Sequence, residues 1–332
     1  PKTERYDREA LVVGHKASKK YKMTLVDDIV YNPANLKFGA IARNKYGNAV
    51  FSPIYVTLEV QTNRVFPKFI EYILTSKCFI NRALRYQQGT VYERQSVNVE
   101  SLLLQTVNIP AKDEQIKISD LLYKFDQLLG LYQHKLKMLL LKKKALLQKL
   151  FPKDGERYPE LRFPGFTDAW EQRKLSDILK VNSGKDYKHL DQGNIPVYGT
   201  GGYMLSMNES LSNIDAIGIG RKGTIDKPQY LKAPFWTVDT LFYLTALDKH
   251  SILFLYYLMQ LIPWKKFDES TGVPSLSKTT IDIISGFVPS NSKEEELISA
   301  LFNQLDKSIT LHQRKLDHLQ LQKKALLQQM FV

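Results

Sequence analysis

The stretches "KKALLQKLF" (Lys143–Phe151) and "KKALLQQMF" (Lys323–Phe331) are nearly identical, although they lie 180 residues apart. The same shift continues without a gap back to Glu114 and Glu294. Matched positions along it include Ile118 and Ile298, Asp126 and Asp306, Gln133 and Gln313, and Lys135 and Lys315. A register kept over about forty residues does not arise by chance, so the chain contains an internal duplication.

Both copies of the duplicated segment place apolar residues at alternating steps of four and three. The first series is Ile118, Leu122, Phe125, Leu129, Tyr132, Leu136, Leu139, Lys143, Leu146 and Leu150. The second is Ile298, Phe302, Leu305, Ile309, His312, Leu316, Leu319, Lys323, Leu326 and Met330. This spacing predicts a coiled-coil seam, in which the two polar lysines set the register at some cost in stability.

The duplication continues more weakly into the sequence ahead of each helix. "FIEYIL" (Phe69–Leu74) resembles "FLYYLM" (Phe254–Met259), so each repeat is a globular α/β domain followed by a long helix. Between the repeats, "FPKDGERYPELRFPGF" (residues 151–166) carries three prolines and two glycines, which forbid a continuous helix and indicate a linker.

We therefore predict an α+β chain with two tandem α/β domains, a pair of long coiled-coil helices that pack on each other and an internal pseudo-two-fold repeat. The predicted boundaries are 1–111 for the first domain, 112–151 for its helix, 152–168 for the linker, 169–291 for the second domain and 292–332 for its helix. Nothing in the first repeat matches "WEQRKLSDILKVNSGKD" at the start of the second. The first domain is therefore expected to be truncated at its N-terminus.

Composition restricts the partners and the compartment. The formal charge is +13 and the sequence pI about 9.4, which favours a polyanionic partner, nucleic acid first and an anionic membrane second. The single cysteine, Cys78, forms no internal disulfide and is expected to be buried in a helix. The longest apolar run, residues 252–262, is too short to span a membrane, and no secretory signal is visible. These features predict a cytoplasmic protein.

The glycines of "DAIGIGRKGTID" (Asp215–Asp226) match the G-x-G-x-x-G spacing of dinucleotide-binding folds. That fold needs a helix directly after the glycines, so that the phosphate can bind at its N-terminus. The sequence that follows, "TIDKPQYLKAPFWTVD", contains two prolines with β-branched and aromatic residues instead. We interpret the glycines as a tight turn between strands that holds Arg221 and Lys222 at its tip.

Several other positions interleave basic, aromatic and amide side chains that can contact phosphates or base edges. The first repeat offers Arg43, Asn44, Lys45, Gln88, Tyr92 and Arg94. The second offers Lys185, Tyr187, Lys188, Tyr198, Thr200, Arg221, Lys222 and Lys278. We expect fewer than half of these candidates to touch DNA, the rest being ordinary surface or packing residues.

Signatures of catalysis are missing from the sequence. There is no G-x-x-x-x-G-K-[ST] phosphate loop, and "NPAN" (Asn32–Asn35) only approaches the Asn-Pro-Pro-aromatic motif of amino-methyltransferases. The six histidines show no metal-ligand spacing, and no nucleophile arrangement stands out. We predict a recognition protein without a catalytic residue, metal or cofactor of its own.

Three stretches carry a resemblance to a known family. "YPELRFPGFTDAWEQRKLSDI" (Tyr158–Ile178) resembles the start of a target-recognition domain in specificity subunits of type I restriction-modification systems. "IPVYGTGGY", "IGIGRKGTID" and "TGVPSLSK" resemble later landmarks of that domain, and "KKALLQKLF" resembles the end of the family's spacer helix. The similarity covers nearly the whole chain.

The resemblance implies that both globular domains are target-recognition domains, each reading one part of a split site in double-stranded DNA. It further implies an antiparallel helix pair that fixes the gap, two docked methyltransferase subunits and two motor-nuclease subunits. S-adenosylmethionine, ATP and magnesium would belong to those partners. Two other hypotheses stay open from the residues alone: a stand-alone DNA-binding or bridging protein that dimerises by its coiled coil, and an enzyme that uses the glycine loop.

Overall fold

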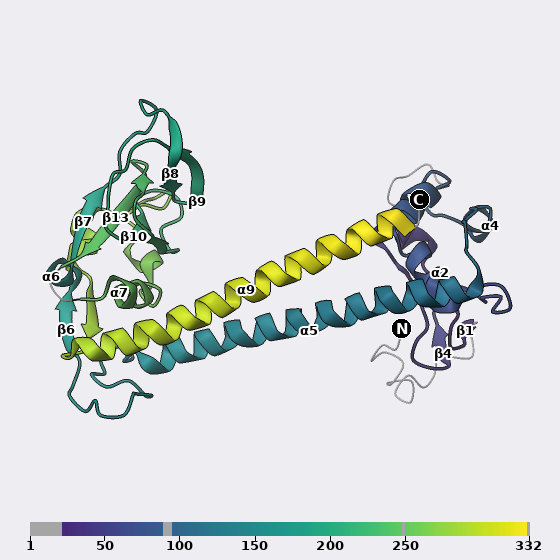
Figure 1. Ribbon diagram of the computed structural model, residues 1–332, viewed down its shortest axis with the longest axis horizontal. Coiled ribbons are helices and arrows are strands. Elements are labelled where there is room, and N and C mark those ends of the chain that lie inside the picture. The colour runs from purple at the N-terminus through teal and green to yellow at the C-terminus, as the bar shows by residue number, and fades with distance from the viewer. Residues whose placement is uncertain (1–21, 89–94, 248–249, 331–332) are drawn as a thin grey trace. The chain divides into compact units, whose positions relative to one another are not determined.

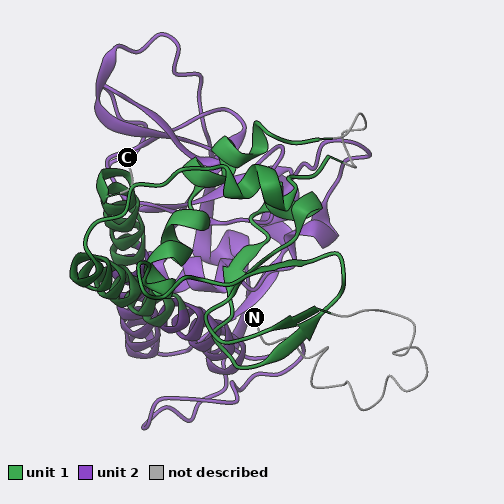
Figure 2. Ribbon diagram, turned by 90° about the vertical axis from the view of Figure 1, so that its right-hand side faces the viewer, with its two compact units in different colours: residues 1–133, 314–332 green, residues 134–313 purple. Residues whose placement is uncertain are grey.

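A computed structural model describes residues 22–88, 95–247 and 250–330. Two helices of 39 residues dominate it, α5 (Lys112–Leu150) and α9 (Ser292–Met330) (Figure 1). The chain divides into two compact units, residues 1–133 with 314–332 and residues 134–313 (Figure 2). Both boundaries fall inside the long helices, so each compact unit combines one globular domain with parts of both helices.

The predicted seam is the least exposed stripe of both helices. All twenty positions of the two four-three series are buried or half-buried, including Lys143 and Lys323, whereas most of the positions between them are exposed. In unit 2 the helices run antiparallel, because Lys143 pairs with Asp306 while Phe151, just past the end of α5, contacts Phe302 near the start of α9. The prediction of an antiparallel coiled-coil pair is confirmed.

Unit 1 packs two helices on a small antiparallel sheet of order β3–β2–β5, beside a second sheet of β1 and β4. Its core joins Ile29 and Tyr31 of the sheet to Phe69 of α2 and Phe79 of α3. α2 begins with Pro67, and α3 is capped by the Ser76 hydroxyl. The elements are β1 (Lys22–Thr24), β2 (Ile29–Tyr31), η3 (Pro33–Phe38), β3 (Ile41–Arg43), β4 (Ala49–Phe51), β5 (Val56–Leu58), α2 (Pro67–Leu74), α3 (Lys77–Leu84) and α4 (Val99–Leu103).

Unit 2 is built around an antiparallel sheet of order β11–β10–β13–β7, with further sheets β12–β8–β9 and β14–β6. Every residue of its strand β10 is buried. Its elements are β6 (Glu171–Lys174), α6 (Leu175–Ile178), β7 (Leu179–Ser183), β8 (Gln192–Gly199), β9 (Gly202–Met207), β10 (Ala216–Gly220), β11 (Gln229–Leu231), β12 (Trp236–Thr237), β13 (Leu241–Ala246), α7 (Ile252–Met259), η5 (Trp264–Phe267), α8 (Lys278–Ile283) and β14 (Ser285–Val288).

The linker after α5 is held against the start of α9. Trp170 is buried against Phe151 and Phe254. Arg162 donates two hydrogen bonds to the carboxylate of Glu294, at 2.7 and 2.8 Å, and the Glu294 side chain is 1% exposed. The hydrogen bond with Glu294 raises the pKa of Arg162 above its ordinary value. A buried, bidentate ion pair of this kind fixes the geometry of the connection as well as its charge balance.

Two expectations about single features can be compared with the structure. Cys78 lies in α3 as predicted, but its side chain is exposed, so the expectation of a buried thiol was wrong. It occupies the outer face of that helix, whereas Phe79 and Ile80 face the core. Within the described ranges, no helix combines the length and apolar character that crossing a membrane requires.

Candidate nucleic-acid interface

The turn after β10 presents two cations at the end of a completely buried strand. Arg221 and Lys222 are exposed, whereas the five residues ahead of them are buried. β10 then pairs antiparallel with β11, which stands where a dinucleotide fold would need its helix. The interpretation of the glycines as a strand-to-strand turn is therefore confirmed.

Two glycines make this turn geometrically possible. A Cβ atom at Gly220 would overlap the carbonyl oxygen of Thr224, and Gly223 has φ +90°, a region that residues with side chains rarely adopt. Gly223 also lies beside Thr200, whose hydroxyl oxygen would be 3.6 Å from a Cβ atom there. The glycine spacing thus serves the close approach of two loops, which places Thr200 next to the basic turn.

Arg221, Lys222 and Lys278 line one cavity of about 380 Å³, although about 57 residues separate the first from the last. Ser183, Ser275 and Ser277 add hydroxyl groups to its wall, and Phe242 and Leu276 add apolar surface. No acidic residue lines the cavity, and none of the three cations has an acidic partner among the described residues. The cavity therefore combines concentrated positive charge with hydrogen-bond donors, which suits a phosphate or the acceptor edge of a guanine.

The loop that leads to Lys278, the first residue of α8, is joined directly to the basic turn. The Gly223 amide donates to the Pro274 carbonyl at 2.8 Å, and the Leu276 amide donates to the Arg221 carbonyl at 3.0 Å. Lys222 and Ser275 form an isolated antiparallel bridge. These backbone contacts hold the two loops as one structure, so the backbone positions of the three cations are fixed relative to one another.

Two carboxylates, Asp268 and Glu269, organise the same loop from within. Asp268 accepts hydrogen bonds from the backbone amides of Ser275 and Ser270, which lower its pKa. Glu269 accepts from the hydroxyls of Thr280 and Ser277, which lower its pKa. Both carboxylates are therefore held in the charged form and bind the loop's own polar groups, without lining the cavity.

The remaining candidates of unit 2 divide between surface and packing. Lys185 and Lys188 are exposed, and the backbone of Lys185 is held by Trp236 and Thr237. Tyr187 packs into the cluster around Val197 and Trp236. Tyr198 packs against the cluster formed by Ala216, Leu231 and Phe235. The two tyrosines thus contribute apolar packing within the domain.

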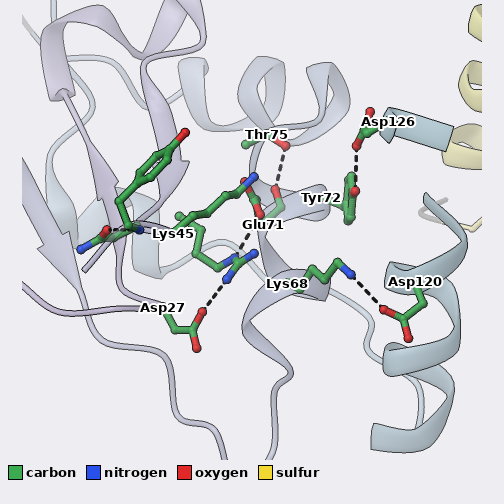
Figure 3. A network of polar contacts seen from close by, with 11 residues as sticks. Asp27, Lys45, Lys68, Glu71, Tyr72, Thr75, Asp120 and Asp126 are labelled. Atoms are coloured by element: carbon green, nitrogen blue, oxygen red, sulfur yellow. Dashed lines mark hydrogen bonds and ion pairs between the residues drawn. The ribbon is translucent and has the colours of Figure 1, made fainter. Parts of the chain in front are cut away.

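The candidates of unit 1 are largely engaged within the domain (Figure 3). Arg43 pairs with Asp27 at 2.5 Å and with Glu71 at 3.1 Å, and its side chain is 15% exposed. Burial alone would lower the pKa of Arg43, but the hydrogen bonds to both carboxylates outweigh burial and raise the pKa. Lys45 also pairs with Glu71, at 2.6 Å. These cations neutralise carboxylates of their own domain.

Asn44 and Gln88 likewise use their polar groups locally. The buried Asn44 amide donates to the carbonyls of Leu25 and Gly47 at 2.9 and 2.7 Å, which shapes the turn after β3. Gln88 is exposed and accepts a hydrogen bond from Asn98 at 3.2 Å. Tyr92 and Arg94 lie outside the described residues.

Sequence reasoning missed Ser183, Ser275, Ser277 and the two loop carboxylates. The serines are distant from Arg221 in sequence and carry no charge signal, and the role of Asp268 and Glu269 depends on a loop conformation that spacing does not reveal. The signal available was the alternation of acidic and hydroxyl residues in "DESTGVPSLSKTT", which is typical of side chains that bond their own backbone.

Comparison with known proteins supports the interpretation of this domain. Residues 167–321 match the family model described as the type I restriction modification DNA specificity domain. The chain is also 27% identical over 99 residues to the specificity subunit of the type I restriction enzyme MjaVIII of Methanocaldococcus jannaschii. That stretch covers 28% of this chain and 23% of the relative's length.

Two solved structures share the fold at low sequence identity. The S subunit of a type I restriction-modification system from M. genitalium is 19% identical, with a TM-score of 0.71 over 94% of this chain and 84% of that chain. A chain from a study of complex assembly and conformational transition in the type I R-M system is 15% identical, with a TM-score of 0.53 over 95% and 84% of the two chains. At these identities the likeness establishes the fold, including the helix pair predicted above.

Proposed function

We propose that this chain, whose residues 167–321 belong to the type I restriction modification DNA specificity domain family, is the non-catalytic DNA-reading subunit of a type I restriction-modification complex. The observation that carries the proposal is the cavity of unit 2, in which three cations meet hydroxyl groups beside two joined loops. None of the three cations has an acidic partner within the described ranges. Such a surface matches double-stranded DNA in charge and in hydrogen-bond chemistry.

In this proposal the cavity provides both affinity and part of the sequence reading. Arg221 can fork onto the O6 and N7 atoms of a guanine, while Lys222 and Lys278 contact phosphates on either side. Ser275 and Ser277 add short hydrogen-bonding groups. Because the two loops are joined through backbone hydrogen bonds, little conformational freedom is lost when DNA binds.

Of the other residues predicted to contact DNA, we retain some in the proposal and set others aside. Lys185, Lys188 and Thr200 are retained as further contacts in unit 2, because the two lysines are exposed and Thr200 adjoins the basic turn. Gln88 is retained in unit 1 as an exposed amide. Arg43, Asn44, Tyr187 and Tyr198 are better explained by ion pairs, buried hydrogen bonds and packing.

We further propose that the two globular domains read the two parts of a split site and that the helix pair sets the gap between them. A helix of 39 residues is about 58 Å long, which is comparable to one or two turns of DNA. Two methyltransferase subunits would dock on this chain, and two motor-nuclease subunits would join them for restriction. Those partners would supply S-adenosylmethionine, ATP and magnesium.

A stand-alone protein that dimerises through its coiled coil is less well supported. In each unit the seam of one helix is already covered by the other helix of the same chain, through Lys143 with Asp306 and Lys323 with Asp126. The seam is therefore not free to pair with a second copy. Co-purification with methyltransferase subunits, against isolation as a homodimer, separates the two hypotheses.

The proposal is tested by reversing the charge of the basic turn. Arg221→Glu with Lys222→Glu is expected to weaken specific binding by the assembled complex about 100-fold, since each lost base or phosphate contact contributes 1 to 3 kcal/mol. Lys266→Glu with Lys293→Glu, at two exposed lysines outside the cavity, is the matched control. Gel-shift titration measures affinity, and mapping of methylated adenines identifies the site. Equal affinity of both variants would remove the cavity from the interface.

A further inference from the structure

Two points of attachment between each globular domain and its long helix recur in both units. At the first point, the side chain of residue 115 or 295 in the long helix accepts a hydrogen bond. The donor is the backbone amide just ahead of the domain helix, which is α2 in unit 1 and α7 in unit 2. The Phe66 amide donates to Gln115 at 2.8 Å, and the Ser251 amide donates to Glu295 at 2.9 Å. The acceptors match under the shift of 180, so this contact belongs to the duplication.

The second point in unit 2 joins three side chains from three elements. The Tyr257 hydroxyl of α7 donates to Asp306 of α9 at 2.9 Å, and Lys143 of α5 donates to the same carboxylate at 2.6 Å. The ammonium group also lies 5.3 Å from the centre of the Tyr257 ring. Burial, followed by the charge of Asp306, raises the pKa of Tyr257, which keeps the hydroxyl protonated as a donor.

Unit 1 contains the same arrangement with the two helices exchanged. The Tyr72 hydroxyl of α2 donates to Asp126 of α5 at 2.7 Å, as Figure 3 shows. Lys323 of α9 donates to the same carboxylate and lies 5.5 Å from the Tyr72 ring centre. The pKa of Tyr72 is raised by burial and by its hydrogen bond to Asp126. We call each set of lysine, aspartate and tyrosine a latch.

The latches are retained although their surroundings differ between the repeats. The aspartates and lysines match under the shift of 180, and the tyrosines match in "FIEYIL" and "FLYYLM". The side chains next to them do not. Lys68 stands where unit 2 has Leu253, Tyr123 where it has Asn303, and Glu71 where it has Tyr256. Packing alone does not require the same three polar residues in two different settings.

A latch contributes less stability to the seam than an apolar pair could at the same positions. The side chains of Lys143 and Asp306 are 16% and 32% exposed, so both charges lose much of their hydration. An apolar pair at such a site is commonly as stable as an ion pair or more so. A polar group at a seam position instead disfavours other registers, because a shifted helix would leave the charges unpaired.

We propose that the two latches are register sensors, which allow each globular domain to seat on its helix only when the opposite helix is in the correct antiparallel register. The lysine of each latch comes from the other repeat, whereas the aspartate and the tyrosine come from the same repeat. Slippage of the helices by one heptad, about 10 Å, would remove the lysine and leave the tyrosine–aspartate contact uncompensated. Resting on the function proposed above, the latches would also limit the complex to a single gap between half-sites.

The test uses the full chain with Cys78→Ser and spin labels at two pairs of exposed positions in unit 2. The distance between labels at Gln148 and Gln304 reports the register of the helices. The distance between labels at Lys266 and Gln304 reports the position of the domain on α9. Lys143→Met with Lys323→Met removes the charge from both latches. Lys144→Met with Lys324→Met changes the exposed neighbouring lysines and is the matched control.

The latch variant is expected to broaden both distance distributions measured by electron paramagnetic resonance, while the control keeps both narrow. Lys143→Arg with Lys323→Arg is expected to restore them, because arginine keeps the charge. Tyr257→Phe is expected to broaden only the domain distribution. If the methionine latch variant kept both wild-type distributions, the proposal would be overturned. If the methionine variant does not fold, Tyr257→Phe is tested instead. An unchanged distance distribution between labels at Lys266 and Gln304 would then overturn the proposal.

Methylation mapping separates this inference from the proposed function. Complexes with the wild-type chain are expected to methylate split sites of one gap, and complexes with the latch variant sites of more than one gap. A wild-type chain that directs no methylation, together with labels that respond as expected, would leave the latches in place and refute the DNA-reading role. One unchanged gap in the latch variant, with labels also unchanged, would refute the latches alone.

Discussion

Units 1 and 2 use the same attachments to the helices but present different surfaces on the matched loops. In unit 2 the turn after β10 exposes Arg221 and Lys222, and no carboxylate among the described residues pairs with them. In unit 1 the matched loop carries Arg43 and Lys45, and both pair with Glu71. The two copies of one ancestral domain have therefore kept their helix contacts and diverged in the use of their cations.

A single position accounts for much of that divergence. Glu71 of α2 matches Tyr256 of α7, which is half-buried and packs against Tyr230 with ring centroids 5.6 Å apart. A carboxylate at this position attracts the cations of the neighbouring strand into the domain, whereas a tyrosine ring does not neutralise them. The comparison indicates that helix attachment constrains one face of the domain helix and leaves the adjacent position free to alter the surface.

The largest effect is expected from removing that carboxylate. Glu71→Gln leaves Arg43 with Asp27 alone and frees Lys45, so unit 1 is expected to lose about 3 kcal/mol of stability, as when one member of a buried pair is removed. Hydrogen exchange of the α2 amides measures this loss. Glu100→Gln, at an exposed side chain, is the control.

The same variant sharpens the comparison through DNA binding. If Glu71 is what withholds the cations, Glu71→Gln raises the non-specific affinity of unit 1 for DNA at low salt, and it steepens the salt dependence by about one phosphate contact per freed cation. An unchanged salt dependence, with α2 still folded, would mean that these cations face away from DNA for another reason.

The second prediction compares the two latches directly. Asp306→Asn leaves Lys143 without its charged partner, and the expected loss is about 2 kcal/mol in the protection of α7 amides. Asp126→Asn should cost less in α2, about 1 kcal/mol, because the side chains of Lys323 and Asp126 are more exposed, at 20% and 40%. A larger loss in α2 than in α7 would contradict the ranking by burial.

The long helices could be predicted from the sequence because their seam is periodic and local. The four-three series predicted the seam and the special status of Lys143 and Lys323, and the proline-bearing linker separated the repeats. The basic turn was also predictable, because glycines directly flank Arg221 and Lys222. In each case the deciding residues are neighbours in the chain.

The partners of the candidate side chains could not be predicted in the same way. Arg43 meets Glu71 across 28 positions and from a different element. Lys278 lines the same cavity as Arg221 although β13 and α7 lie between them in the chain. Tyr187 and Tyr198 have the composition of nucleic-acid contacts but lie over apolar clusters. Charge and aromatic content indicate that the chain has a nucleic-acid-binding surface. Tertiary contacts decide which cations remain available to form that surface.

The third prediction concerns the loop that carries Lys278. Glu269→Gln weakens the hydrogen bonds from the Thr280 and Ser277 hydroxyls, which keep the start of α8 in place. We expect specific DNA affinity to fall about five-fold, with little change in overall stability because this site is exposed. Glu296→Gln is the control at an exposed helix position. A loss no greater than that of the control would show that the loop holds its shape without Glu269.

The smallest effect is expected from alkaline pH. Burial and Asp306 raise the pKa of Tyr257 in the folded chain, whereas in the unfolded chain the hydroxyl ionises near pH 10. Because the folded pKa is the higher one, the stability contributed by the protonated hydroxyl is complete below pH 10 and is lost as the pH rises above it. By pH 10.5 the loss is about 0.8 kcal/mol for this tyrosine. Tyr257→Phe should therefore remove that part of the alkaline destabilisation, as should Tyr72→Phe in unit 1. The check is the slope of the unfolding free energy against pH in the alkaline range. Equal slopes for Tyr257→Phe and the wild type would mean that folding does not protect the Tyr257 hydroxyl from ionisation. The two latches would then not be equivalent in the role of their tyrosines.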